Sequence, residues 1–424
     1  MSEPASSARL EAPLDNLPFR RDALTWLMYG MLGAYNYLLS GLGPLMPSLR
    51  QELRLSYTVT SLHFSAWAVG MILAGLAGDR LVRAWGRRAV FWLGAGGLAL
   101  GAVALTQARQ PVQTIGSVLL MSAVGSLVLV LIPAVLADQH GARRTLAIVE
   151  ANILAAATGA LAGVLIGLGQ ATPAGWRGPW LVILLVPLAL FVRYRAVALP
   201  LPAAPPRPDA RTRSVRLPAA YWAYWVTVVL VVGVEFSLIF WGADFLTAAG
   251  LGVSAAATTV SLFLWGMVAG RIVGRQVAQW LPAERLLPAA LVVAAAGFFL
   301  YWLAPLLPLT VLGLFVAGLG VANLFPLGAA LAMGAAPGLS NEAGARLSFA
   351  SGAAILAAPL LLGTLADAVG IALAYAVVPV FLAGAVLASW LGAMWSRRQG
   401  VGVSDGAGAA ASSDAPLGIT REDQ

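Results

Sequence analysis

Two related stretches lie on either side of the midpoint of this 424-residue chain: Gly70-Met-Ile-Leu-Ala-Gly75-Leu-Ala-Gly78-Asp79-Arg80 and Gly266-Met-Val-Ala-Gly270-Arg271-Ile-Val-Gly274-Arg275. Further pairs follow in the same order and at similar separation: Trp67 with Trp265, Pro133 with Pro326, and Gly141-Ala142-Arg143 with Gly344-Ala345-Arg346. Any one pair could arise by chance, but several in the same order indicate an internal duplication. The sequence therefore predicts two related halves.

The composition assigns these halves to a membrane. The chain is 60% hydrophobic and only 10% charged, which excludes a water-soluble globular domain. A bilayer core of roughly 30 Å needs about 20 apolar residues per helix. Continuous apolar runs favour helices over a transmembrane barrel, whose strands would alternate. Twelve runs are long enough, near residues 23–48, 57–78, 89–107, 112–136, 146–170, 178–197, 219–246, 254–275, 286–305, 308–334, 345–366 and 371–395. We therefore expect an all-α polytopic membrane protein with twelve transmembrane helices in two pseudo-symmetric six-helix halves.

The remaining segments divide the chain. The first 22 residues have no apolar run of their own, so they do not resemble a cleavable signal peptide. Proline and arginine dominate the stretch between the sixth and seventh spans, which is typical of a linker. The predicted organisation is an N-terminal tail (1–22), an N-terminal half (23–198), a linker (199–217), a C-terminal half (218–396) and a disordered tail (397–424).

The arginines predict the orientation. All 26 basic residues are arginine, and with a cytoplasmic N-terminus only Arg50, Arg54, Arg109 and Arg177 would lie outside. The positive-inside rule therefore predicts that the linker and both termini are cytoplasmic. The formal charge of +8 is explained by this topology and by attraction to anionic membrane lipid, so we expect no nucleic-acid partner.

The loop after the second span carries the most specific motif. Gly75, Asp79 and Arg80 are followed by Gly86-Arg87-Arg88, and Gly363 to Gly370 matches it at the end of the eleventh span. This pattern resembles the signature of the major facilitator superfamily, although five residues separate Arg80 from Gly86 where the family usually has one. The resemblance implies two six-helix halves joined by a cytoplasmic linker. It also implies a gating role for Gly75, Asp79, Arg80, Gly86, Arg87, Arg88 and Asp367. The alternative for the arginines is that they only anchor topology.

Polar residues inside the spans mark where a solute could pass. They occur in spans one, two, five, seven and ten, whereas spans three, six, nine and twelve nearly lack them, and the family places these four spans at the periphery. Polar groups avoid lipid, so we expect them to face a central cavity. The predicted substrate-binding residues are Asn36, Tyr37, Ser40, His63, Asn152, Tyr224, Trp241, Trp265 and Asn323. The alternatives are hydrogen bonding between helices for the asparagines and serine, a backbone contact for His63, and packing for the tryptophans.

Two glutamates are candidates for proton coupling. Glu235 lies near the middle of span seven among apolar neighbours, with no arginine expected at comparable depth. Desolvation would favour a protonated side chain or one paired with a cation, which suits a proton carrier. The alternative is a permanently neutral, hydrogen-bonded glutamate. Glu150 lies near the cytoplasmic start of span five, where an ion pair with Arg143 is the alternative.

The predicted function is secondary active transport of a small organic solute by alternating access, coupled to protons. Proton-driven efflux of lipophilic compounds or drugs is the alternative, and a transport-inactive membrane sensor is a third reading. The chain has only two histidines, no cysteine and no HExxH motif, which argues against an enzyme and against a metal site. It also lacks a Walker loop, so we do not expect ATP to be the energy source. We expect no cofactor and a monomeric, multi-pass protein of a bacterial-type cytoplasmic (inner) membrane.

Overall fold

The computed structural model describes residues 19–200 and 216–398. Most of the two predicted tails and of the predicted linker therefore lies outside the described residues. Within the described ranges every regular element is a helix, which confirms the predicted all-α class. The division into five segments stays a prediction.

The first half of the chain contains six α-helices and one short 3-10 helix. In chain order they are α1 (Ala23–Leu53), α2 (Tyr57–Gln107), α3 (Pro111–His140), η2 (Gly141–Arg143), α4 (Arg144–Gly169), α5 (Arg177–Val182) and α6 (Leu185–Tyr194). The second half contains α7 (Ala219–Ala248), α8 (Val253–Val277), α9 (Ala283–Leu303), α10 (Leu307–Val321), α11 (Leu324–Gly334), α12 (Ser340–Val369), α13 (Ile371–Ala374) and α14 (Val377–Arg398).

These helices are consistent with the twelve expected spans. Among the described residues, nine helical stretches are long and apolar enough to cross a membrane. Two of them, Tyr57–Gln107 and Pro111–Gly169, each contain two of the expected spans, and α1 accounts for the remaining one. Gly86 marks the break inside α2, because its φ of 79° and ψ of 158° are not helical. Only glycine adopts such a φ at little cost, so this residue allows the chain to turn back between two spans.

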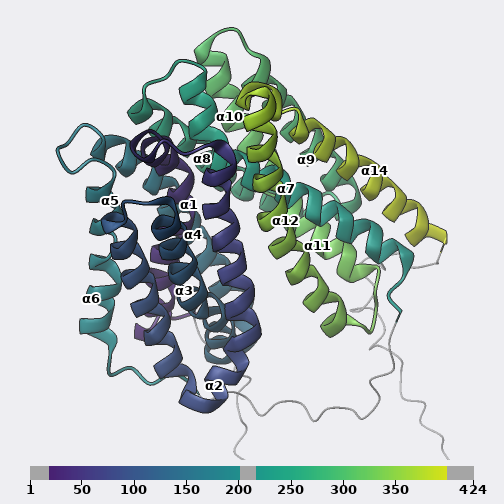
Figure 1. Ribbon diagram of the computed structural model, residues 1–424. Coiled ribbons are helices and arrows are strands. Elements are labelled where there is room, and N and C mark those ends of the chain that lie inside the picture. The colour runs from purple at the N-terminus through teal and green to yellow at the C-terminus, as the bar shows by residue number, and fades with distance from the viewer. Residues whose placement is uncertain (1–18, 201–215, 399–424) are drawn as a thin grey trace, which may run out of the picture.

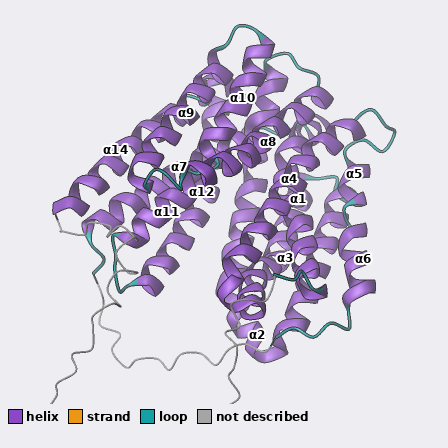
Figure 2. Ribbon diagram, turned by 180° about the vertical axis from the view of Figure 1, so that it is seen from behind, coloured by secondary structure: helices purple, strands orange, loops and turns teal. Residues whose placement is uncertain are grey.

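The two halves meet at one end of the molecule and separate toward the other (Figures 1 and 2). We call the first the closed end; it contains the end of α1, the start of α2 and the end of α12. We call the other the linker end, because α6 ends and α7 begins there. The linker end is the one that the arginine distribution predicts to be cytoplasmic.

Helices α2 and α12 show how the contact between the halves ends. They run antiparallel, and the backbone of Tyr57 contacts Asp367 while Ile72 packs against Gly352. One turn further along α2, a side-chain carbon added at Gly75 would meet nothing within 4 Å. The two halves are thus packed together over the closed-end portion of these helices and apart beyond it.

Glycines on α4 allow the halves to approach closely. A side-chain carbon added at Gly163 would lie 2.2 Å from Ser261 Oγ, and one at Gly167 would lie 2.1 Å from Thr258 Oγ1, both on α8. The four-residue spacing of Gly159, Gly163 and Gly167 predicts a face for close helix contact. Gly163 and Gly167 pack against α8 and Gly159 packs against α1, so this face does make close helix contacts.

Candidate functional site

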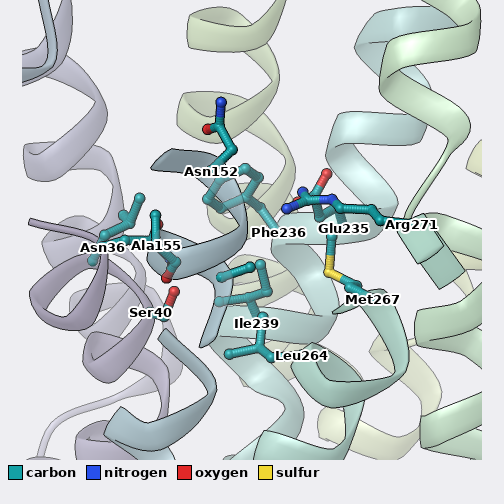
Figure 3. Close-up of a pocket in the computed structure, with 12 residues that line it drawn as sticks. Asn36, Ser40, Asn152, Ala155, Glu235, Phe236, Ile239, Leu264, Met267 and Arg271 are labelled. Carbon is teal, nitrogen blue, oxygen red and sulfur yellow. The ribbon is translucent and has the colours of Figure 1, made fainter. Parts of the chain in front are cut away.

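A pocket lies between the two halves, and Figure 3 shows the residues that line it. Helices α1 and α4 supply one wall and helices α7 and α8 the other. The lining residues are Asn36, Leu39, Ser40, Asn152, Ala155, Ala156, Glu235, Phe236, Ile239, Leu264, Met267 and Arg271. The pocket therefore depends on both halves and would change shape if they moved relative to one another.

The lining is polar on one side and apolar on the other. On the closed-end side, Leu39, Ile239 and Leu264 form an apolar floor, and the hydroxyl group of Ser40 on α1 lies at the same level. Glu235 and Arg271 lie about one to two turns nearer the linker end, on α7 and α8. A solute entering from the linker end would meet the charged groups first and the apolar floor last.

Glu235 and Arg271 face the same part of the pocket (Figure 3). Both are half-buried. The electrostatic influence of Arg271 reaches Glu235, yet among the described residues no hydrogen bond or ion pair within 4.0 Å involves either side chain. Sequence reasoning expected no arginine at the depth of Glu235, and that expectation is wrong. The available signal was the position of Arg271 inside the eighth span, four residues before Arg275.

Three of the predicted substrate-binding residues line this pocket: Asn36, Ser40 and Asn152. The Asn36 amide donates to the carbonyl oxygen of Ala155 at 2.6 Å and so joins α1 to α4. Ser40 is buried beside Gly159, again between α1 and α4. The Asn152 amide donates to Ile148 on its own helix at 2.8 Å, and the residue is otherwise exposed. Asn36 and Ser40 thus combine the two roles that the sequence left open, helix contact and pocket lining.

The structure places other predicted binding residues in packing contacts away from this pocket. The Tyr37 hydroxyl donates to the carbonyl oxygen of Pro179, and the buried His63 ring lies 2.8 Å from Thr114 Oγ1. Trp241 is fully buried and donates to the carbonyl oxygen of Pro359, whereas Trp265 on α8 is 41% exposed and does not line the pocket.

Tyr224 and Asn323 also lie outside the pocket. The Tyr224 ring packs close to Gly392 of α14. The Asn323 amide, at the break between α10 and α11, donates to the carbonyl oxygen of Gly270 at 2.8 Å. This bond ties the break to α8 one residue before Arg271.

Glu150 is held in an ion pair at the start of the first half. Its two carboxylate oxygens accept from Arg21 at 2.6 and 2.8 Å, and one also accepts from the Tyr29 hydroxyl at 3.1 Å. Hydrogen bonding to Glu150 raises the pKa of the Arg21 guanidinium above its ordinary value, so the pair stays ionised. The sequence suggested Arg143 as the partner of Glu150, whereas the structure pairs it with Arg21.

The closed end is held by charged groups from both halves. Arg50 Nε on α1 lies 2.9 Å from Asp244 Oδ1 on α7, and the guanidinium covers the Tyr57 ring at 4.1 Å from its centroid. Asp367 accepts from the backbone nitrogens of Tyr57 and Thr58, each at 2.8 Å, so α12 caps the start of α2. Sequence reasoning selected Asp367 but missed Arg50 and Asp244.

Aromatic rings pack beneath this charged layer. Phe64 of α2 stacks on Phe240 of α7 with ring centroids 4.2 Å apart and an interplanar angle of 2°. Trp241 meets Phe64 edge-on at 5.4 Å and Tyr57 at 5.7 Å. Together the ion pair, the helix cap and the rings separate the pocket from the closed-end surface.

At the linker end, the contacts described for the predicted gating residues Arg87 and Arg88 are with groups of the first half. Asp79 and Arg80 are exposed. Arg87 donates to Asp138 at 2.6 Å, and Arg88 donates to the carbonyl oxygen of Arg195. Both of these contacts stay within the first half.

The fold and the site define a class: a multi-pass α-helical membrane protein with a pocket between its two halves. A sequence profile described as the Major Facilitator Superfamily matches residues 25–338, which is most of the chain. The protein belongs to the Major Facilitator Superfamily and is a secondary transporter, as the motif resemblance implied. A comparison with curated protein sequences finds no match.

Solved structures of similar fold include several transporters. A bacterial homologue of the human lysosomal transporter Spinster, in an inward-facing and unoccupied conformation, aligns with a TM-score of 0.73 at 13% identity, over 90% of this chain and 99% of that one. A D-xylose–proton symporter aligns with a TM-score of 0.67 at 13% identity, over 87% and 96%. The peptide transporter POT in complex with sulfate aligns with a TM-score of 0.69 at 15% identity, over 88% and 94%. At these identities the likeness establishes the fold.

Proposed function

We propose that this protein moves a small organic solute across the cytoplasmic membrane by alternating access and that it couples this movement to protons through Glu235. The observation that carries the proposal is the pocket lined by both halves, with a carboxyl group from α7 among its lining residues. Ionisable groups inside a membrane are costly and mark solute or proton paths.

Alternating access requires contacts that form at one end when those at the other break. In the present state the closed end carries the Arg50–Asp244 ion pair and the Asp367 cap. At the linker end Asp79 faces no partner from the other half among the described residues. On the antiparallel helices α2 and α12, Tyr57 lies opposite Asp367 and Ile72 lies opposite Gly352. Two helical turns further along α2, the same register places Asp79 opposite the turn of α12 that carries Arg346. We propose that closure of the linker end joins these two groups.

Glu235 suits proton coupling because of what surrounds it. Arg271 on α8 is the charged side chain that acts on it, and the amides of Asn36 and Asn152 lie across the pocket. Movement of the halves would change the distance from Glu235 to the opposite wall and the water around it. Such a change in environment is what couples a carboxyl group's proton to a conformational cycle. Glu150 suits the role less well, because Arg21 occupies both of its oxygens.

The test is proton movement into proteoliposomes against a panel of sugars, organic acids and lipophilic compounds. The native protein should show solute-dependent proton uptake, and Glu235→Gln should abolish it. Glu284→Gln, which removes a carboxylate from the first turn of α9 outside the pocket, is the matched control and should keep the native rate. Undiminished flux in Glu235→Gln would refute the coupling role of this residue.

A further inference from the structure

Arg271 stands out among the arginines of the described chain, because it lies in the pocket rather than at a membrane surface. It is half-buried on α8, six residues before the helix ends at Val277. The duplicated stretch gives it an informative counterpart: Gly266 and Met267 correspond to Gly70 and Met71, so Arg271 corresponds to Gly75. The second half therefore carries a positive charge at a position where the first half has glycine. Helix packing or membrane topology that the two halves share does not explain this arginine.

The charge of Arg271 is not neutralised within the described part of the protein. No carboxylate lies within ion-pair distance of its guanidinium, and Glu235 influences it only at longer range. An arginine inside a membrane normally pairs with an anion or a carbonyl group. Five N–H donors in a planar fork match a carboxylate with two parallel hydrogen bonds. The unpaired guanidinium thus has the geometry of an anion site that is open to the pocket.

The rest of the lining limits what the anion can be. The floor of Leu39, Ile239 and Leu264 would accept an apolar body, and Phe236, one turn nearer the linker end on α7, adds an aromatic ring near Asn152 (Figure 3). The amides of Asn36 and Asn152 offer polar contacts on the wall opposite Arg271 (Figure 3). A small molecule with a carboxylate at one end and an apolar or lightly polar body matches this arrangement.

We propose that Arg271 binds the carboxylate of a small organic anion whose body rests on the apolar floor, so that the transported solute is a monocarboxylate. This inference rests on the proposed function, since it names the substrate class of the same pocket. A neutral Glu235 leaves the pocket with a net positive charge, which favours the anion, whereas an ionised Glu235 competes with it for Arg271. Binding of the solute and of the proton would then support one another.

The first experiment measures ligand-induced stabilisation of the purified native protein. The probes are acetate, butyrate, hexanoate, lactate, benzoate and phenylacetate, each beside its neutral amide at the same concentration. We expect at least one carboxylate to raise the melting temperature in a saturable way and its amide to leave it unchanged. This comparison needs no variant, so it does not depend on whether a substitution folds.

The second experiment uses the stabilising carboxylate with three variants. Arg271→Gln should weaken its binding about 10- to 100-fold, as expected for the loss of hydrogen bonds to a charged group. Arg271→Lys, which keeps the charge but not the fork, should retain part of the affinity. Arg275→Gln removes an exposed arginine one turn further along the same helix and should bind like the native protein.

Two results would overturn the inference: no carboxylate stabilises the native protein, or a carboxylate stabilises Arg271→Gln as well as it does the native protein. These outcomes are distinct from failure of the proposed function. Proton flux driven by a neutral solute and lost in Glu235→Gln would preserve the proposed function and refute the carboxylate. Carboxylate binding that depends on Arg271, with proton flux unchanged in Glu235→Gln, would support the carboxylate site and refute the proton-coupling role of Glu235.

Discussion

The two partners of the Arg50–Asp244 ion pair differ strongly in how deeply their side chains are buried. The Asp244 side chain is completely buried, whereas 24% of the Arg50 side chain is exposed. Asp244 Oδ2 has no hydrogen-bond partner among the described residues, so this carboxylate depends on Arg50 for its compensation. Burying an unpaired charge costs more than losing a pair whose remaining member can be hydrated.

We therefore predict unequal effects of the two neutral substitutions. Arg50→Gln should destabilise the protein by about 3 kcal/mol, because it leaves a buried carboxylate without a cation. Asp244→Asn should cost less, since Arg50 keeps its contact with the Tyr57 ring and access to water. Melting temperatures of the purified variants provide the measurement.

The double variant Arg50→Gln/Asp244→Asn is the control for this asymmetry. It removes both charges and should melt above Arg50→Gln alone. If the double variant were less stable than either single variant, with losses that simply add, the two side chains would not be coupled.

At the scale of the helices, small residues determine how closely the halves pack. Gly163 meets both Ser261 Oγ and the carbonyl oxygen of Ala257, so a methyl group there has no room while α4 and α8 stay in place. Gly116 on α3 provides the opposite case, because a side-chain carbon there meets nothing within 4 Å. The same substitution at the two positions separates helix propensity from packing between the halves.

We predict that Gly163→Ala lowers stability by about 1–3 kcal/mol through overpacking. Gly116→Ala should be neutral or stabilising by up to about 1 kcal/mol, because alanine is the better helix former. Thermal unfolding of both variants in the same detergent tests this. Equal shifts in melting temperature would show that the α4–α8 contact does not limit the packing.

At the scale of the whole molecule, the two ends should open and close in opposition. The chain contains no cysteine, so pairs of spin labels can be introduced without removing native residues. Arg83 on α2 and Glu342 on α12 are exposed positions toward the linker end, and Arg54 and Ala368 are exposed at the closed end.

We predict that Asp79→Asn shifts the distance distributions of both pairs in opposite directions. Losing the carboxylate should reduce the population with a short Arg83–Glu342 distance and increase the population with a short Arg54–Ala368 distance. Pulsed electron spin resonance in lipid nanodiscs measures both, and slower solute transport should accompany the shift.

Glu284→Gln on the labelled background is the control and should leave both distributions unchanged. Distances that changed in the same direction at both ends would argue against alternating access. Unchanged distributions in Asp79→Asn would remove this residue from the gate.

The sequence by itself determined the class, the helical spans and the duplication. Bilayer thickness and hydropathy fix the length of each span. The break inside α2 at Gly86 was found only in the structure. Among the polar residues that the sequence singled out in the spans, Asn36, Ser40, Asn152 and Glu235 line one pocket, and their roles stay a prediction.

Only the tertiary structure decided which charged groups face one another. Hydropathy gives the depth of Arg271 or Asp244 along its own helix, but the direction in which a side chain points depends on how α1, α4, α7 and α8 pack together. His63 and Trp241 illustrate the same limit, because both are buried in contacts between helices rather than in the pocket. Packing of α7 against α8 places Glu235 and Arg271 in the same wall of the pocket, and packing between the halves brings Arg50 beside Asp244. No periodicity within a single helix encodes those pairs.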